Sequence, residues 1–195
     1  MKLRLVAASA LLGSFVSAQA AADSISVSLS NDTAYAEYGM PLEYSAYGRT
    51  DLEFGVMNTD SSDLMGTVGI SMIGEVGSQA PGLQFGLTIK GYAMSFDESD
   101  IDVAAITLGV KAWFVPPQAS RIGVIVHGNY APAITTYADA ETLWEAGIRA
   151  EYEVLPGAAM FVGYRRVSAT LESQPADNAD IDMDEGGHIG LRMTF

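Results

Sequence analysis

The feature that most constrains this chain is an alternation of apolar and polar residues that recurs with a period of two. The segments 83–90 and 145–154 are clear examples, because an apolar side chain stands at every second position of each. Such alternation indicates β-strands with one apolar and one polar face. After residue 22 no apolar run is long enough for a membrane helix, so a membrane location would require a closed barrel.

The alternation predicts about ten strands. They cover residues 24–30, 33–40, 50–58, 64–76, 83–96, 103–115, 120–131, 142–155, 158–171 and 187–195. Several exceed the roughly 9–11 residues that cross a bilayer at a tilt, whereas strands of soluble sandwiches commonly have about 5–6. The first two segments are short and form either a hairpin turning at 31–32 or one bent strand. Bacterial barrels close with even strand numbers, which favours the hairpin and ten strands, with eight as the alternative.

The links between the predicted strands fall into two classes that alternate along the chain. Short or Pro- and Gly-rich links occupy residues 77–82, 116–120 and 156–157; longer or acidic links occupy residues 58–63, 97–102, 131–141 and 172–186. Outer-membrane barrels have this arrangement of tight periplasmic turns and longer outer loops. The link at 41–49 is the exception, because it is longer than a periplasmic turn should be. We therefore expect an all-β fold, a closed antiparallel transmembrane β-barrel over residues 23–195.

Residues 1–22 have the three parts of a secretory signal peptide. Lys2 and Arg4 form a basic start, residues 5–16 are apolar, and residues 17–22 are small. Cleavage after Ala20 or after Ala22 fits equally well. The apolar stretch is too short for a transmembrane helix, and a buried N-terminal helix is the alternative interpretation. The leader predicts export, with the outer membrane as the destination.

Composition excludes two further classes of function. The net charge is -14, with 24 acidic against 10 basic residues, which argues against a nucleic-acid partner because phosphate contacts need a basic face. The chain has no cysteine, so it can form neither a disulfide framework nor a thiolate site.

If the apolar faces meet lipid, the polar faces point into the barrel and carry charges of both signs. The predicted luminal charge network comprises Glu53, Glu75, Lys90, Lys111, Arg121, His127, Glu145, Arg149, Glu151, Glu153, Arg165, His188 and Arg192. A barrel of eight to ten strands has an interior little wider than its side chains, so opposite charges inside it should pair. This favours a structural or gated barrel with a charged lumen.

Glycines on the same face support a second interpretation of the lumen. They are Gly55, Gly69, Gly86, Gly109, Gly123, Gly147 and Gly190. Because glycine leaves space, a narrow porin-like channel for small polar solutes is the alternative. A soluble periplasmic β-barrel with an apolar interior also stays open, since alternation does not say which face points inward.

Aromatic residues on the apolar faces favour a membrane setting. The set is Phe54, Phe85, Phe114, Tyr130, Tyr152, Phe161 and Phe195. Several lie near strand ends, where the interfacial girdles of membrane barrels would place them. The alternative is an ordinary aromatic core.

No catalytic motif is recognisable, and we expect neither an enzyme nor a cofactor. A hydrolase would need a serine and a histidine within hydrogen-bond reach. Outer-membrane lipid A deacylases place this serine two residues after the histidine, but Asn129 stands there after His127. The simpler interpretation is that His127 and His188 join the luminal network.

Two acidic segments, 97–102 and 177–185, carry oxygen ligands that hard cations prefer. Their spacing departs from the EF-hand pattern, so solvated loop tips are the favoured interpretation. A weak divalent-cation site and a surface binding module through these outer loops are the alternatives. The expected neighbours are outer-membrane lipid and lipopolysaccharide.

Several segments, taken together with the leader, resemble the YfaZ family of small outer-membrane proteins of Gram-negative bacteria. They are the Ser-rich 24–29, and residues 127–132, 161–166 and 190–195. The resemblance spans most of residues 23–195 and implies a barrel and an outer-membrane address, but no substrate. The final set Ile189, Leu191, Met193 and Phe195 also resembles the C-terminal signal that the barrel-assembly machinery recognises.

Overall fold

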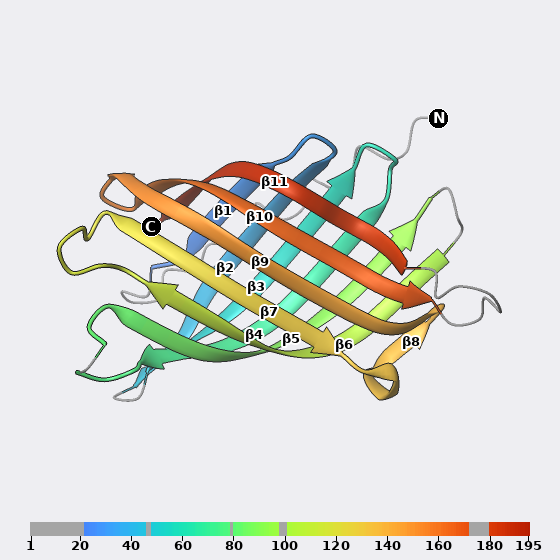
Figure 1. Ribbon diagram of the computed structural model, residues 1–195, viewed down its shortest axis with the longest axis horizontal. Helices are drawn as coiled ribbons and strands as arrows, with labels where there is room; N and C mark the ends of the chain where they lie inside the picture. The colour runs from blue at the N-terminus through green and yellow to red at the C-terminus, as the bar shows by residue number, and fades with distance from the viewer. Residues whose placement is uncertain (1–21, 46–47, 79, 98–100, 172–179) are drawn as a thin grey trace.

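The computed structural model describes residues 22–45, 48–78, 80–97, 101–171 and 180–195. Within them, ten antiparallel strands form the wall of one barrel (Figure 1). The strands are β1 (Ser24–Leu29), β2 (Thr33–Ser45), β3 (Gly48–Thr59), β4 (Leu64–Glu75), β5 (Leu83–Phe96), β6 (Ile101–Phe114), β7 (Ile122–Ala131), β9 (Ala140–Leu155), β10 (Ala158–Leu171) and β11 (Asp180–Thr194). The predicted leader, apart from Ala22, lies outside the described residues.

The barrel is closed by pairing between its first and last strands. β1 pairs with β11 over six residue pairs, from Ser24 with Thr194 to Leu29 with Ile189. Every other wall strand pairs with the wall strands that precede and follow it in the chain. A short piece, β8 (Thr136–Ala138), follows a turn of 3-10 helix, η2 (Ala133–Thr135), and pairs with β6 outside the regular wall. The predicted hairpin of the first two segments and the count of ten strands are confirmed.

Two predicted links are wrong because the strands are longer than expected. The link predicted at 41–49 shrinks to residues 46–47, since β2 continues to Ser45 and β3 begins at Gly48. Pro41 is accommodated by a register shift between Pro41 and Glu43, where a missing N–H is tolerated. The link predicted at 172–186 also ends earlier, because β11 begins at Asp180.

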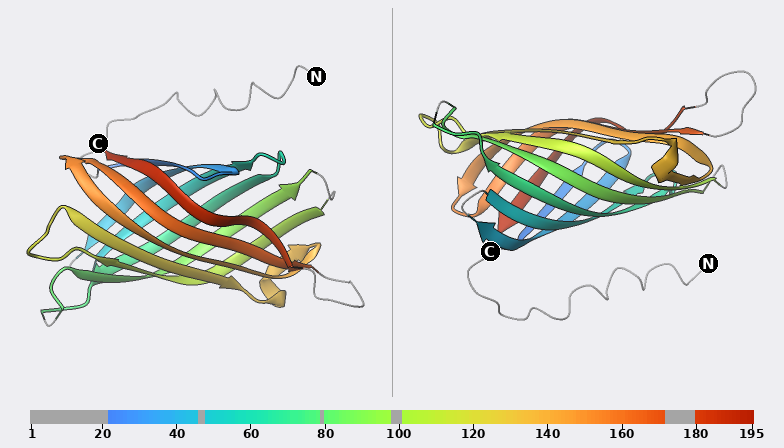
Figure 2. Two further views of the ribbon diagram at one scale, coloured as in Figure 1. Left: turned by 45° about the horizontal axis from the view of Figure 1, so that its top comes forward. Right: turned by 90° about the horizontal axis from the view of Figure 1, so that it is seen from below.

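The two ends of the barrel differ, and Figure 2 shows both. The turn end carries Phe195 and the links after β2, β4, β6 and β9, and the loop end carries the links after β1, β3, β5, β7 and β10. A two-residue turn joins β9 to β10 at residues 156–157, where Gly157 has a φ of 78° that favours glycine. The Thr194 N–H donates to the Gly157 carbonyl at 2.7 Å and fastens this turn to β11.

The apolar faces of the strands point outward. Ile189, Leu191, Met193 and Phe195 are 66%, 57%, 54% and 57% exposed, and similar rows run along the other strands. Water-soluble proteins rarely expose so continuous an apolar surface, whereas the lipid-facing belt of a membrane barrel is of this kind. The alternative of a soluble barrel with an apolar interior is therefore wrong. Among the described residues no helix is long and apolar enough to cross a membrane.

The aromatic side chains follow this belt with one exception. Six are outward and at least 41% exposed: Phe54, Phe85, Phe114, Tyr130, Tyr152 and Phe195. Phe161 was predicted to join them, but it is buried and faces the lumen. The phase of β10 explains the error, since Met160 and Val162 occupy the outward positions on either side of it.

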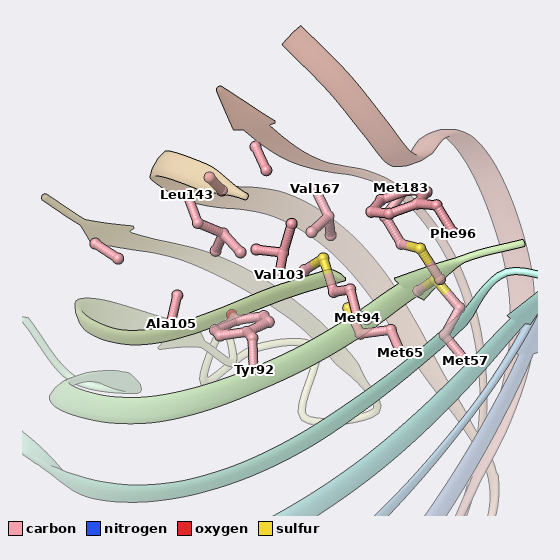
Figure 3. Packing of buried hydrophobic residues seen from close by; sticks show 13 residues of the cluster. Met57, Met65, Tyr92, Met94, Phe96, Val103, Ala105, Leu143, Val167 and Met183 are labelled. Carbon is pink, nitrogen blue, oxygen red and sulfur yellow. The ribbon is translucent and has the colours of Figure 1, made fainter. Parts of the chain in front are cut away.

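The interior is divided along the barrel axis into two layers. At the loop end lies an apolar cluster (Figure 3), composed of Met57, Met65, Tyr92, Met94, Phe96, Val103, Ala105, Ala131, Ala140, Leu143, Val167, Ala169 and Met183. Below it, toward the turn end, the inward positions carry the charged residues of an ionic layer. Four methionines fill the irregular space of the cluster, as their flexible side chains allow.

Candidate functional site: the barrel lumen

Glu145 on β9 is the centre of the ionic layer. Its buried carboxylate accepts hydrogen bonds from Lys90 Nζ at 3.0 Å, from Asn129 Nδ2 at 3.2 Å and from the Tyr92 hydroxyl. The His127 ring nitrogen Nε2 lies 3.3 Å from its other oxygen. Partners from β5 and β7 thus compensate a carboxylate that would be costly to bury alone.

Other ion pairs cross the lumen between strands that are not neighbours. Lys111 Nζ on β6 lies 2.7 Å from Glu53 Oε1 on β3, and Arg192 Nη2 on β11 lies 2.8 Å from Glu151 Oε2 on β9. Glu151 is shared with Arg149, whose Nε lies 3.0 Å from Oε1. Such pairs join strands of the wall that are not adjacent in the sheet.

A third group of polar contacts lies beside the apolar cluster. Arg165 Nε donates to Asp184 Oδ2 at 2.8 Å, and both side chains are buried. Thr33 Oγ1 donates to the other oxygen of Asp184 at 3.0 Å, and the Arg165 guanidinium stacks over the Tyr35 ring at 4.5 Å. These contacts join β2 to β10 and β11 near the loop end.

Most members of the predicted luminal network face the interior, but two do not belong to it. Arg121 is exposed in the turn before β7, because this strand begins at Ile122 rather than at residue 120. Glu75 is exposed at the last position of β4. Glu153 lines the opening at the turn end. His188 is buried with its ring edge-on to Phe161 at a centroid distance of 6.0 Å.

Several luminal residues were missed in the sequence. Asp184 lies in β11, within the part that the sequence predicts to be a loop. Glu37 lies on the inward face of β2, two residues after Tyr35. The Tyr35 hydroxyl donates to Glu37 Oε2 at 2.9 Å. Asp51, which pairs with Arg49 at 2.8 Å, stands two residues before Glu53 on the same face. The period of two would have identified Glu37 and Asp51.

The luminal glycines lie under large side chains of neighbouring strands. A Cβ atom at Gly147 would come within 2.5 Å of the His127 ring, and one at Gly163 within 2.7 Å of the His188 ring. The same relation holds between Gly55 and Tyr35, Gly109 and Asn129, Gly190 and Phe161, and Gly123 and Trp113. These glycines therefore make room for inward side chains.

Cavities inside the barrel include three that share no residue with the apolar cluster. A cavity of about 70 Å³ lies among Lys90, Glu145 and Arg149, and one of about 90 Å³ lies nearer the turn end. A third, of about 260 Å³, occupies the turn-end mouth beside Trp113 and Arg192. These three cavities lie on the turn-end side of the apolar cluster.

The loop-end acids hold backbone groups of the links. Asp63 Oδ1 accepts a hydrogen bond from the Asp97 N–H at 3.0 Å, and Asp139 Oδ2 accepts one from the Asp102 N–H at 3.0 Å. Within the described ranges, no three His, Asp or Glu side chains are grouped to hold a metal ion. Residues 98–100 and 172–179 of the predicted acidic links lie outside these ranges.

Comparison with known proteins gives a family and several distant structures. The family model described as YfaZ precursor matches residues 1–195. None of the curated proteins matches the sequence. A chain solved in work on the in-meso crystallization of membrane proteins is 10% identical, with 90% of this chain and 83% of that chain covered and a TM-score of 0.47.

Two further structures are similar at the same low level. OmpT of Vibrio cholerae is 10% identical at a TM-score of 0.43, with 84% of this chain covered. A bacterial polysaccharide outer membrane secretin is 12% identical at a TM-score of 0.44, also with 84% of this chain covered. The aligned part spans 56% of the length of each of these two proteins.

Proposed function

This chain belongs to the YfaZ family, and we propose that it is a structural barrel of the outer membrane whose lumen is closed to solutes. The observation that carries the proposal is the apolar cluster that fills the loop-end lumen. An ion or polar solute on a straight path through the barrel would have to leave water and pass among methionine, phenylalanine and leucine side chains. Apolar constrictions of this kind stop conduction by excluding water.

The ionic layer supports the same proposal. Its cross-lumen pairs, such as Lys111 with Glu53, occupy the space through which a polar pore would run. Because the luminal glycines lie under neighbouring side chains, they leave no continuous row of gaps. The narrow porin-like channel is the second candidate, and the turn-end cavities are the observation that favours it.

Planar-bilayer recording of the purified protein tests the closed lumen. We expect no steady conductance steps, and reproducible steps would overturn the proposal. Insertion has to be demonstrated in the same preparation, by heat-modifiable migration on gels and by protease resistance of the strands. A well-behaved porin in the same lipid serves as the positive control.

The proposal includes neither a catalytic role nor a cofactor. It is supported by the engagement of both histidines, since His127 contacts Glu145 and His188 packs against Phe161. A screen of His127→Ala against esterase and lipase substrates tests this part. Any activity of the wild-type protein that the substitution abolishes would contradict it.

We also propose that the chain reaches the outer membrane by export and assembly. The leader would be cleaved after Ala20 or Ala22, and the assembly machinery would read Ile189, Leu191, Met193 and Phe195. All four of these side chains face outward in one row of β11. N-terminal sequencing of the membrane-extracted protein and fractionation of Phe195→Ala test these steps. Lipid and lipopolysaccharide are the proposed neighbours of the exterior.

A further inference from the structure

We propose that the loop-end half of β11 is a docking edge, on which an extended and positively charged peptide segment adds as a further strand. The inference concerns the outer rim of the barrel and is independent of whether the lumen conducts. It rests on an open strand edge, on its position relative to the apolar belt, and on the charges beside it.

The edge exists because β1 is much shorter than β11. β1 pairs with β11 only from Leu29 with Ile189 down to Ser24 with Thr194. Residues 180–188 lie beyond the last residue pair of this ladder and form backbone pairs with β10 on one side alone, while the Thr33 side chain at the hairpin tip reaches Asp184. No other described strand bonds to their second side. In Figure 1, β10 and β11 reach further along the barrel than the tip of this hairpin.

The backbone groups that face the open side follow from the phase of the β1–β11 ladder. The Phe195 N–H donates to the Asp23 carbonyl at 2.9 Å. In an antiparallel pair every second residue bonds to the same neighbour, so Gly187 and Glu185 continue this series past the end of β1. Their N–H and C=O groups therefore point to the open edge, as those of an edge strand do.

Two adjacent glycines lie in this edge. Gly186 and Gly187 stand side by side in the strand, and a Cβ atom at Gly186 would meet no atom within 4 Å. Glycine weakens a strand interior, and it commonly marks a place where a ligand or another backbone approaches closely. The open segment has nine residues and is about 30 Å long at most. The register shift at Met183 and Asp184 bends it, so the regular part of the edge is the part that contains Glu185 and Gly187.

The edge lies beyond the apolar belt. Along β11 the outward positions change from Ile189, which is 66% exposed, to Gly187 and then to the exposed Glu185. Arg166 on β10 is half-buried at the same level and pairs with Asp182 at 3.3 Å and with Glu185 at 3.5 Å. These charges indicate an aqueous rim rather than lipid, so a soluble peptide can reach the edge.

The charges select a basic occupant. Asp180, Asp182 and Glu185 are exposed along β11, with Arg166 as the countercharge. Two further acids, Asp32 and Asp60, lie at the tips of the β1–β2 and β3–β4 hairpins. The Asp60 N–H donates to the Asp32 carbonyl at 2.8 Å, which keeps these two tips together. A second copy of this chain would bring like charges together, which disfavours self-pairing.

Binding of a designed peptide to the full-length protein in detergent micelles tests the proposal. The probe is a fluorescent eight-residue peptide of alternating Lys and Thr. The matched probe has the same sequence and charge but carries N-methyl groups on four consecutive central residues, which removes N–H groups on both edges. We expect the first peptide to bind at low salt and the second to bind at least tenfold more weakly. Equal binding of the two peptides would show that only electrostatic attraction is at work, and it would overturn the proposal. The absence of binding by the first peptide would overturn it as well.

Two measurements on the protein locate the contact. The Gly187 amide should exchange with solvent more slowly when the unmodified peptide is present, and unchanged exchange would contradict strand addition. Glu185→Gln should weaken binding several-fold, whereas Glu141→Gln, the same change at an exposed loop-end position of β9, should not. Equal effects of the two substitutions would remove the assignment to β11. Charged residues on an edge strand can also prevent pairing with another chain. Peptide binding that depends on Glu185 would distinguish a docking edge from an edge whose charges prevent pairing.

Discussion

Lys90 Nζ lies 3.0 Å from Glu145 Oε2, although their strands, β5 and β9, are separated in the wall by β6 and β7. The pair therefore spans the interior rather than the surface of the sheet. It is buried at both ends, and it is surrounded by the Tyr92 hydroxyl, the Asn129 amide and the His127 ring. Several predictions about stability depend on this geometry.

Glu145→Ala should destabilise the barrel by about 3–5 kcal/mol, because Lys90 would remain buried without its partner. Equilibrium unfolding in denaturant, followed by tryptophan fluorescence in detergent, measures this change. Glu153→Ala at the turn-end mouth is the matched control and should cost less than about 1 kcal/mol. Equal losses for the two variants would contradict the central role of Glu145. Replacing Lys90 and Glu145 together by methionine should recover much of the stability.

Gly147→Ala should be destabilising by about 1–3 kcal/mol, because the new methyl group would come within 2.5 Å of the His127 ring. Gly66→Ala is the control, since a Cβ atom there would meet nothing within 4 Å. The same unfolding measurement applies, and a second substitution, His127→Ala, should suppress part of the Gly147→Ala defect. If the Gly147 and Gly66 variants unfold alike, the close packing under His127 is not as described.

Polar substitution of the apolar cluster should open the lumen. We expect the triple variant Met57→Ser, Met65→Ser and Met94→Ser to show small conductance steps that the wild type lacks, because water can then enter the loop-end layer. Met160 lies on the outward face and is 56% exposed, so Met160→Ser should produce no conductance steps. A folded triple variant without conductance would indicate that the ionic layer alone closes the barrel.

A charge placed on the outer face should lower the stability of the barrel by an amount that depends on its depth in the membrane. Leu108 is 69% exposed near the middle of β6, and Leu108→Arg should lower the stability of the lipid-inserted barrel by about 2–4 kcal/mol. Phe114→Arg, at the turn end of the same strand, should cost about 0–1 kcal/mol. Reversible unfolding from lipid vesicles gives both values. A larger loss at Phe114 would place the middle of the membrane elsewhere on the barrel.

The period of two predicted the fold well because the outward face of each strand is apolar along most of its length. It failed where the inward face changes character. On β5 the large apolar residues stand at outward positions up to Ile89, whereas beyond Lys90 they stand at the inward positions Tyr92, Met94 and Phe96, so the apolar face changes sides within one strand. The apolar cluster was missed for this reason.

The first residues of β11 and the last residues of β2 were also missed. In β11, Met183 and Asp184 are both buried, because the register with β10 shifts between Val167 and Ser168. Two consecutive inward residues break a period of two and suggest a loop. The charged set itself was largely predictable, but its pairing was not, since partners such as Lys111 and Glu53 lie 58 positions apart in the chain.

The seam between β1 and β11 also governs how the molecule forms. Ser24 pairs with Thr194, almost the full chain away, while the other pairings along the wall join consecutive elements. Closing so long a loop is slow compared with zipping the hairpins, so the ring closes only after its last strand has arrived. Until then the growing sheet has two bare edges, and each nascent copy can associate with another. The six residue pairs of this seam thus remove both bare edges in a single closing step.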